Sequence, residues 1–203
     1  MNRQFLKRWP SKAELRIARP NAYAHVYTHA VEGLNPFSSD ELKSAWLDTL
    51  RRRLPGTVGT YRGPEVFSDI DVIAFATQSN HPHLVLRQGE DQTAIGRFVA
   101  NSLRAFALHH NRVTGHTGQV FLRPFDAKHL ATRNDVRRAI AYVHRNPKRP
   151  DLINKFTSHP DYLASNSTGF VNVERGLAVF GGRDEYADYF EKYCRAKDVE
   201  EGR

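Results

Sequence analysis

Two pairs of residues have the types and the spacing that metal and phosphate chemistry uses. His81 and His83 are separated by one residue, and Tyr142 and Asn146 by three. Side chains two apart on a strand share a face, so both imidazoles can converge on one metal ion. Side chains four apart project from the same side of a helix. The histidines are therefore a candidate metal pair, and Tyr142 is a candidate reactive hydroxyl.

Each pair also fits a purely structural role. With 10 histidines in 203 residues, chance alone supplies roughly half a His-x-His pair. A tyrosine at a helix boundary often packs its ring and does nothing else. Helix geometry favours Tyr142, however, because it lies roughly 110° from the centre of the apolar stripe on its helix. That stripe consists of Val136, Ala139, Ile140 and Val143.

Basic residues crowd the stretch around Tyr142. They are Arg133, Arg137, Arg138, Arg145, Lys148 and Arg149, and the only acid among them is Asp135. Positive charge of this density stabilises a phenolate and attracts a phosphate backbone. We predict that these six residues bind nucleic acid. A solvated basic face remains the alternative.

The elements that position these residues follow from hydrophobic periodicity and turn residues. The sequence predicts strands over Ala22–Val31, Ile70–Thr77 and His81–Arg87, an extended piece over Gln119–Phe125, and helices over 38–54, Asp91–His110, 132–146 and Arg183–Arg195. The link Gln78-Ser79-Asn80 is short enough for a hairpin. This order predicts an α+β domain in which an antiparallel sheet carries helices on one side, followed by a short C-terminal helical extension.

Two of the predicted helices begin with capping signals. Ser38 with Glu41, and Thr132 with Asp135, have the spacing of a capping box. The polar segment Ser158–Gly169 is predicted to be a loop.

Tyr162 and Asn166 repeat the Tyr-x-x-x-Asn spacing inside that predicted loop. Pro160 argues against a helix there, and without a helix the spacing places nothing on a common face. This second pair is therefore discounted.

Composition limits the class of protein. The chain has 30 Lys and Arg against 22 Asp and Glu, a formal charge of +8, which favours polyanionic partners. Cys194 is the only cysteine, so neither an internal disulfide nor a thiolate metal cluster is expected. No signal peptide and no membrane span are recognisable. We expect a cytoplasmic protein with a basic arm (1–20), a catalytic domain (21–157) and a loop with a helical tail (158–203).

Several segments, in order along the chain, resemble the REP-associated tyrosine transposases, which belong to the single-tyrosine HUH transposases. The segments are AYAHVYTHAVEG, IAFATQSNHPHLVL, GHTGQVFLRPF, AIAYVHRNPKRPDLI and GLAVFGGRDEYADYF. The most specific is the Tyr-x-x-x-Asn-Pro run at a helix end. The resemblance covers about residues 16–193.

This resemblance implies a ferredoxin-like or RRM-type core, the HUH nuclease fold, with the histidines on a central strand. It implies that His81, His83 and Asn146 bind Mg²⁺ or Mn²⁺, and that Tyr142 is the nucleophile. The implied activity is cleavage and rejoining of single-stranded DNA at hairpins or palindromic repeats through a 5′-phosphotyrosine. The implied protein is a monomer or homodimer associated with the nucleoid.

Two other interpretations stay open from the sequence. One is a nucleic-acid binding protein on the same fold that has lost catalysis, for example after domestication. The other is an unrelated metal-dependent hydrolase that uses His81, His83 and a distant acid such as Asp71.

Overall fold

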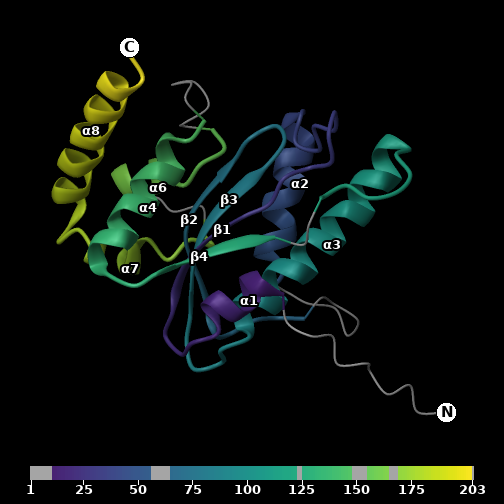
Figure 1. The fold of residues 1–203 in the computed structure, drawn as a ribbon, viewed down its shortest axis with the longest axis horizontal. Coiled ribbons are helices and arrows are strands. Elements are labelled where there is room, and N and C mark those ends of the chain that lie inside the picture. Colours follow the sequence, from purple (N-terminus) through teal and green to yellow (C-terminus); the bar gives the residue numbers. More distant parts are fainter. Residues whose placement is uncertain (1–10, 56–64, 123–124, 148–154, 165–168, 203) are drawn as a thin grey trace.

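One antiparallel sheet forms the centre of the molecule (Figure 1). The computed structural model describes residues 11–55, 65–122, 125–147, 155–164 and 169–202. The strands are β1 (Tyr23–Tyr27), β2 (Ile70–Thr77), β3 (Pro82–Gln88) and β4 (Asp126–Leu130). They lie in the order β2-β3-β1-β4, and each neighbouring pair is antiparallel. The predicted fold class is confirmed, and β3 has a partner strand on each side.

Helices α2 (Asp40–Arg51) and α3 (Ala94–Thr114) cover one face of this sheet (Figure 1). With the strands they complete the β-α-β-β-α-β order of a ferredoxin-like core. Their contact is aromatic, because the ring of Phe106 lies 4.7 Å from that of Phe37 and 5.7 Å from that of Trp46. All three side chains are fully buried. Burial of one such ring contributes about 1.5–3 kcal/mol, so this cluster anchors both helices.

Helix α4 (Arg133–Arg145) packs on the opposite face of the sheet (Figure 1). The predicted arrangement of helices on one side therefore applies to α2 and α3 only. Val136, Ile140 and Val143 of α4 are buried against the sheet. Three more helices follow on this side: α6 (His159–Leu163), α7 (Val173–Ala178) and α8 (Arg183–Glu200). The sheet is therefore enclosed between two helical layers.

The segment predicted as a basic arm contains a helix. Residues Lys12–Ile17 form α1, which begins with a Ser11–Glu14 capping box. Ala13 and Ile17 are buried where α1 packs against β4 and α3. Residues 1–10 of the predicted arm lie outside the described residues.

The extended piece predicted at Gln119–Phe125 is misplaced, because the fourth strand begins at Asp126. Phe121 forms only an isolated bridge to Ala30 and is buried in the core. β4 is an edge strand, and only its Ala127 and Leu130 are buried. A strand with so few buried residues shows only a weak alternation of apolar and polar residues in the sequence. The buried residues that precede it show a pattern that resembles a strand.

Of the two capping predictions, one is confirmed and one is wrong. Thr132 and Asp135 form the predicted capping box of α4. The box at Ser38 is wrong, because Ser39 is the N-cap of α2 and its hydroxyl accepts a hydrogen bond from the Leu42 amide at 3.3 Å. Serine occupies both positions, so sequence alone does not decide between them.

The segment predicted as a loop at Ser158–Gly169 contains α6. Pro160 lies in the first turn of this helix, where a backbone N–H has no intrahelical partner and proline costs nothing. Tyr162 is fully buried, and its hydroxyl donates a hydrogen bond to the Ile73 carbonyl at 2.8 Å. Tyr162 is thus a core residue, while Asn166 lies outside the described residues.

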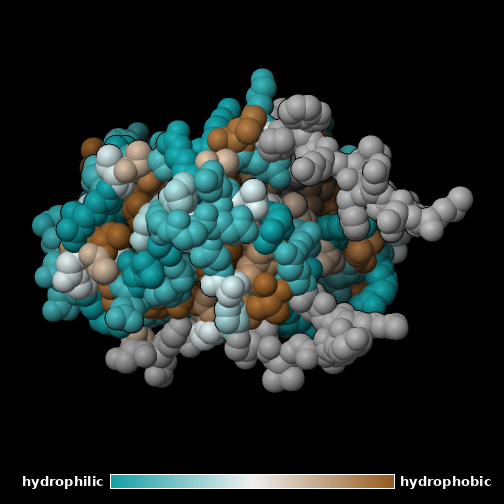
Figure 2. Space-filling view, turned by 90° about the horizontal axis from the view of Figure 1, so that it is seen from below, coloured by the Kyte–Doolittle hydropathy of each residue, from teal (hydrophilic) through white to brown (hydrophobic). Residues whose placement is uncertain are grey.

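The surface seen from below is mainly hydrophilic, with hydrophobic residues in separate patches (Figure 2). Each helix in the described ranges is too short or too polar to span a bilayer.

Candidate active site

The predicted histidines and tyrosine meet on the sheet face that α4 covers. β3 carries His83, and His81 directly precedes this strand. The ring of Tyr142 lies 5.6 Å from the ring of His83, in an edge-on arrangement. The two imidazole rings lie 4.7 Å apart. Residues 59 or more positions apart in the sequence are thereby brought into one cluster.

Helix α4 presents Tyr142 because its apolar stripe fixes the rotation of the helix. Val136, Ile140 and Val143 face the sheet, and Tyr142 on the flank stays 42% exposed, as its helical position predicts.

Asn146 caps the C-terminus of α4, one turn after Tyr142. Its carbonyl accepts a hydrogen bond from the Gln78 side chain at 2.7 Å, which ties the end of the helix to the link before His81. The side chain of Asn146 is buried, and its Nδ2 has no hydrogen-bond partner among the described residues.

These residues line a cavity of about 770 Å³. β1, the histidine segment, β4, α4 and the C-terminal end of α8 form its walls. The side chains that line the cavity include His25, Tyr27, His29, His81, His83, Lys128, Arg138, Tyr142, Arg145, Asn146, Tyr193, Lys197 and Glu201. The cavity is open, and three of its basic side chains (Lys128, Arg138 and Lys197) stand on different walls.

Both predicted metal histidines use Nδ1 for hydrogen bonds within the protein. His81 Nδ1 lies 2.6 Å from Asn80 Oδ1, and His83 Nδ1 lies 3.0 Å from His25 Nε2. His83 Nε2 is buried and has no partner among the described residues. A buried polar atom without a partner is rare in proteins. An imidazole nitrogen that carries no proton in such a position suits a cation, because its lone pair is available.

Burial keeps three histidines of the cavity, His25, His81 and His83, neutral. Desolvation, with a smaller effect of His29, lowers the pKa of His81 to about 4. Desolvation and the neighbouring histidines lower the pKa of His83 to about 2, and desolvation with Lys128 lowers that of His25 to about 4. A neutral imidazole is the form that binds metal.

The predicted donor set consists of two imidazoles and one amide. Within the described ranges, no group of three or more His, Cys, Asp or Glu side chains is arranged to hold a metal ion. The predicted third ligand, Asn146, supplies an amide, which is not one of these four residue types. Rotation of its terminal amide by 180° presents Oδ1, the atom that hard cations prefer, where Nδ2 now lies without a partner.

Sequence reasoning missed the contributions of β1 and α8 to the cavity. His25, Tyr27 and His29 lie in the predicted strand Ala22–Val31 and were not predicted as site residues, although their period of two places them on one face. Their rings contact the predicted metal histidines, with centroid distances of 4.8–5.8 Å. The signal was present in the alternation of histidine and tyrosine. Tyr193 and Lys197 carry no such signal, because only the packing of α8 on α4 brings them there.

The predicted nucleic-acid-binding arginines have different surroundings. Arg133 and Arg137 donate hydrogen bonds to the carbonyls of residues 178–180 after α7. Arg145 forms ion pairs with Asp198 and Glu201 at 2.7 and 3.1 Å. Arg138 lines the cavity beside Tyr142. Lys148 and Arg149 lie outside the described residues.

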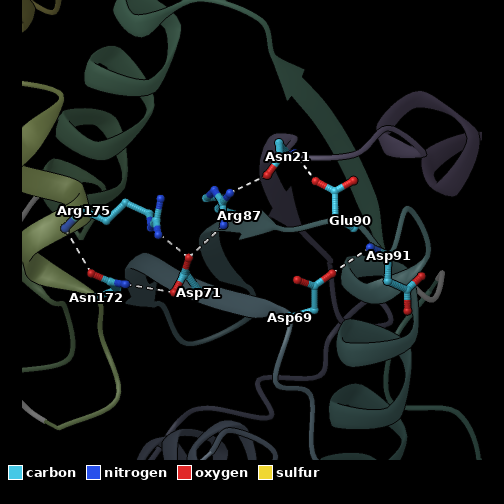
Figure 3. A network of polar contacts seen from close by, with 8 residues as sticks. All are labelled: Asn21, Asp69, Asp71, Arg87, Glu90, Asp91, Asn172 and Arg175. Carbon is cyan, nitrogen blue, oxygen red and sulfur yellow. Dashed lines mark hydrogen bonds and ion pairs between the residues drawn. The ribbon is translucent and has the colours of Figure 1, made fainter.

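Asp71 does not join the histidines. It accepts a hydrogen bond from Asn172 at 2.9 Å and forms ion pairs with Arg175 at 3.0 Å and Arg87 at 3.4 Å (Figure 3). On β2 it lies five residues from Ala76, the partner of His83, which corresponds to roughly 16 Å. The hydrolase that would combine His81, His83 and Asp71 is therefore excluded by the geometry of the sheet.

Comparison with known proteins gives a likeness of fold. No protein-family model matches the sequence, and no curated protein matches it. A solved structure of a REP-associated tyrosine transposase bound to a REP hairpin is similar over 83% of this chain and 90% of that chain, with a TM-score of 0.50 and 10% sequence identity. At this identity the likeness concerns the fold, and the protein shares the fold of that tyrosine transposase.

Proposed function

We propose that this protein cleaves and rejoins single-stranded DNA through a covalent 5′-phosphotyrosine at Tyr142. In this proposal His81, His83 and Asn146 hold a Mg²⁺ or Mn²⁺ ion. The observation that carries it is the exposed Tyr142 ring lying 5.6 Å from the ring of His83, whose buried Nε2 has no partner among the described residues. A nucleophile and a site for a cation thus face the same cavity.

The chemistry of the donor set agrees with this assignment. Two neutral imidazoles and an amide leave the full charge of a divalent ion available to a phosphate. When bound, Mg²⁺ or Mn²⁺ polarises a non-bridging phosphate oxygen. An open cavity of about 770 Å³ gives a phosphodiester access to both the ion site and Tyr142.

Tyr142 then carries the reaction. Its Oη–P bond forms as the bond from phosphorus to the 3′ oxygen breaks. The tyrosine loses its proton, and the departing 3′ oxygen gains one. Because the phosphotyrosine keeps the ester bond, another 3′-OH reverses the step without ATP.

The charged walls of the cavity support a phosphate-bearing substrate. Lys128 on β4, Arg138 on α4 and Lys197 on α8 approach it from three directions. We assign backbone phosphate contacts to these residues, and Arg133, Arg137 and Arg145 remain predicted contacts from the sequence. Arg145 already has two acidic partners.

A hairpin-forming single strand is the substrate that we propose. The transposase with the similar fold is bound to a REP hairpin. In a continuous duplex the paired and stacked bases hold both phosphate backbones on a regular helix, whereas an unpaired strand next to a stem bends freely into a cavity.

The test uses a covalent adduct. The protein is incubated with Mn²⁺ and a library of end-labelled single strands that contain randomised hairpin stems, and adducts are separated on a denaturing gel. We expect an adduct with the wild type, none with Tyr142→Phe, and DNA binding within about threefold in both. Tyr193→Phe is the matched control, because Tyr193 lines the same cavity and this variant leaves Tyr142 in place.

Each outcome separates the alternatives. An adduct that persists in Tyr142→Phe contradicts the assignment of the nucleophile. A wild type that binds hairpins and never forms an adduct identifies a binding protein without catalysis.

A further inference from the structure

The two predicted metal histidines each have a side-chain partner within hydrogen-bond distance of Nδ1. For His81 the partner is the side-chain oxygen of Asn80, at 2.6 Å from Nδ1. An amide oxygen only accepts hydrogen bonds, so His81 Nδ1 carries the proton. The Nε2 of His81 is therefore left with a lone pair.

For His83 the partner is a third histidine, His25, with Nε2 at 3.0 Å from His83 Nδ1. Two directions are chemically possible. If His25 donates, His83 carries its proton on Nε2, where the described residues offer no acceptor. If His83 donates from Nδ1, its Nε2 keeps a lone pair, and only this arrangement lets a cation occupy the place of the missing partner.

The position of His25 suits this role. It lies on β1 opposite Val85, one step diagonal to His83 on β3, and the two imidazoles are stacked with centroids 5.2 Å apart. Its ring also lies 5.6 Å from Tyr142. Contacts with both His83 and Tyr142 restrict rotation of the ring of His25.

We propose that His25 and Asn80 are positioning residues that set the tautomers of His83 and His81, so that both present Nε2 before a divalent cation arrives. This inference rests on the proposed metal site. It adds a strand, β1, that the metal ligands themselves do not include. Neither residue binds the ion.

The test measures Mn²⁺ binding to the full chain without DNA, from the electron paramagnetic resonance signal of free Mn²⁺. His25→Phe keeps a ring of similar shape and removes the acceptor. We expect it to bind Mn²⁺ about 10–100-fold more weakly, the usual loss when a partner of a ligand is removed. His25→Gln restores an acceptor and is expected to recover part of the affinity.

Two controls make the result specific. His83→Ala should remove the site, and His129→Phe, on β4 outside the cavity lining, should bind Mn²⁺ as the wild type does. Nitrogen-15 spectra of the imidazoles in metal-free protein give a second readout. They should show the Nδ1–H tautomer of His83 in the wild type and a mixture of tautomers in His25→Phe.

Asn80→Ala is a second variant for the case in which His25→Phe does not fold. Asn80 is exposed, and its backbone carbonyl still accepts from the Ala30 amide in the variant. We expect weaker Mn²⁺ binding through His81, with an unchanged melting temperature.

The outcomes distinguish this inference from the proposed function. If His83→Ala binds Mn²⁺ as tightly as the wild type, the metal site itself is wrong. If His83→Ala loses the ion while His25→Phe and Asn80→Ala keep wild-type affinity and tautomers, the site stands and the positioning roles are overturned.

Discussion

Among the single residues, Asn146 has two separate roles, one for its backbone and one for its side chain. The backbone carbonyl holds the end of α4 to Gln78, and the buried amide faces the cavity without a partner among the described residues. These two functions separate on mutation, because a substitution of the side chain leaves the backbone contact in place. Asn146 therefore offers a clean test of the third ligand.

Asn146→Ala should raise the Mn²⁺ concentration that cleavage requires by about tenfold or more. Its melting temperature without metal should match that of the wild type, because the lost amide nitrogen had no hydrogen bond. The measurement is a Mn²⁺ titration of hairpin cleavage beside thermal melting curves. Asn134→Ala, on the exposed first turn of the same helix, is the control. Superimposable titrations for Asn146→Ala and Asn134→Ala would show that Asn146 is no ligand.

His81→Ala and His83→Ala should each abolish Mn²⁺-dependent cleavage, and EDTA should silence the wild type. The reason is that neither of the two remaining donors compensates for a lost imidazole. Gel-resolved cleavage with and without EDTA gives the answer. Undiminished cleavage in EDTA would rule out the metal site.

At the scale of elements, one ion-pair cluster fixes α8 to α4. The guanidinium of Arg145 is largely buried between Asp198 and Glu201, and these carboxylates hold the pKa of Arg145 above its ordinary value. Through this contact α8 brings Tyr193 and Lys197 to the cavity wall. The attachment of α8 is thus part of the construction of the site.

Arg145→Gln should lower the free energy of unfolding by about 1–3 kcal/mol, since it removes a largely buried guanidinium and its two ion pairs. Hydrogen exchange should increase along α8. Urea denaturation and exchange measured by mass spectrometry provide both values. Arg195→Gln removes an exposed pair with Glu191 inside α8 and should cost less than about 1 kcal/mol. Equal effects of the two variants would mean that Arg145 does not anchor α8.

Local sequence patterns predicted the elements whose burial is regular. β2 was predicted at its observed residues, since its apolar run is bounded by turn residues on both sides. The flank position of Tyr142 followed from the stripe of α4. The edge strand β4 and the short helix α6 were missed, because the pattern of each is weak and tertiary packing decides their structure. His25 was seen as a strand residue only, since its partner His83 lies 58 positions away.

At the scale of the whole molecule, a buried hydrogen-bonded network joins four elements behind the cavity. Tyr186 of α8 bonds through its hydroxyl to Nδ1 of His144 on α4 and of His159 on α6, each at 2.6 Å. His144 Nε2 lies 2.7 Å from the hydroxyl of Ser158, which accepts from the Phe75 amide of β2. With neutral histidines, every nitrogen and hydroxyl in this chain from Phe75 to Tyr186 has a partner.

This network predicts a loss of stability in acid. Burial lowers the pKa of His159 to about 4 and that of His144 well below its ordinary value. The unfolded state, with pKa values near 6.5, then binds more protons than the folded state below pH 6.5. Stability is complete above that pH and falls as the pH drops from 6.5 towards 4. His159 alone should cost about 2 kcal/mol at pH 5.

Urea denaturation at pH 7 and pH 5 measures this dependence. His159→Gln should reduce the difference between the two pH values by about 2 kcal/mol. His116→Gln, in the loop after α3, should leave the difference as it is in the wild type. A His159→Gln variant with the full wild-type difference would contradict the role of the network.

The walls of the cavity are synthesised in a fixed order. A ribosome makes the chain from its N-terminus, so β1 and the hairpin with His81 and His83 emerge first, Tyr142 later, and the segment from Tyr193 to Glu201 last. A nascent chain that stops before α4 has both histidines and no nucleophile. One that stops before α8 has Tyr142 on a helix whose Arg145 still lacks its acidic partners. The complete cavity therefore exists only once translation has passed residue 201, and unfinished chains lack an assembled site.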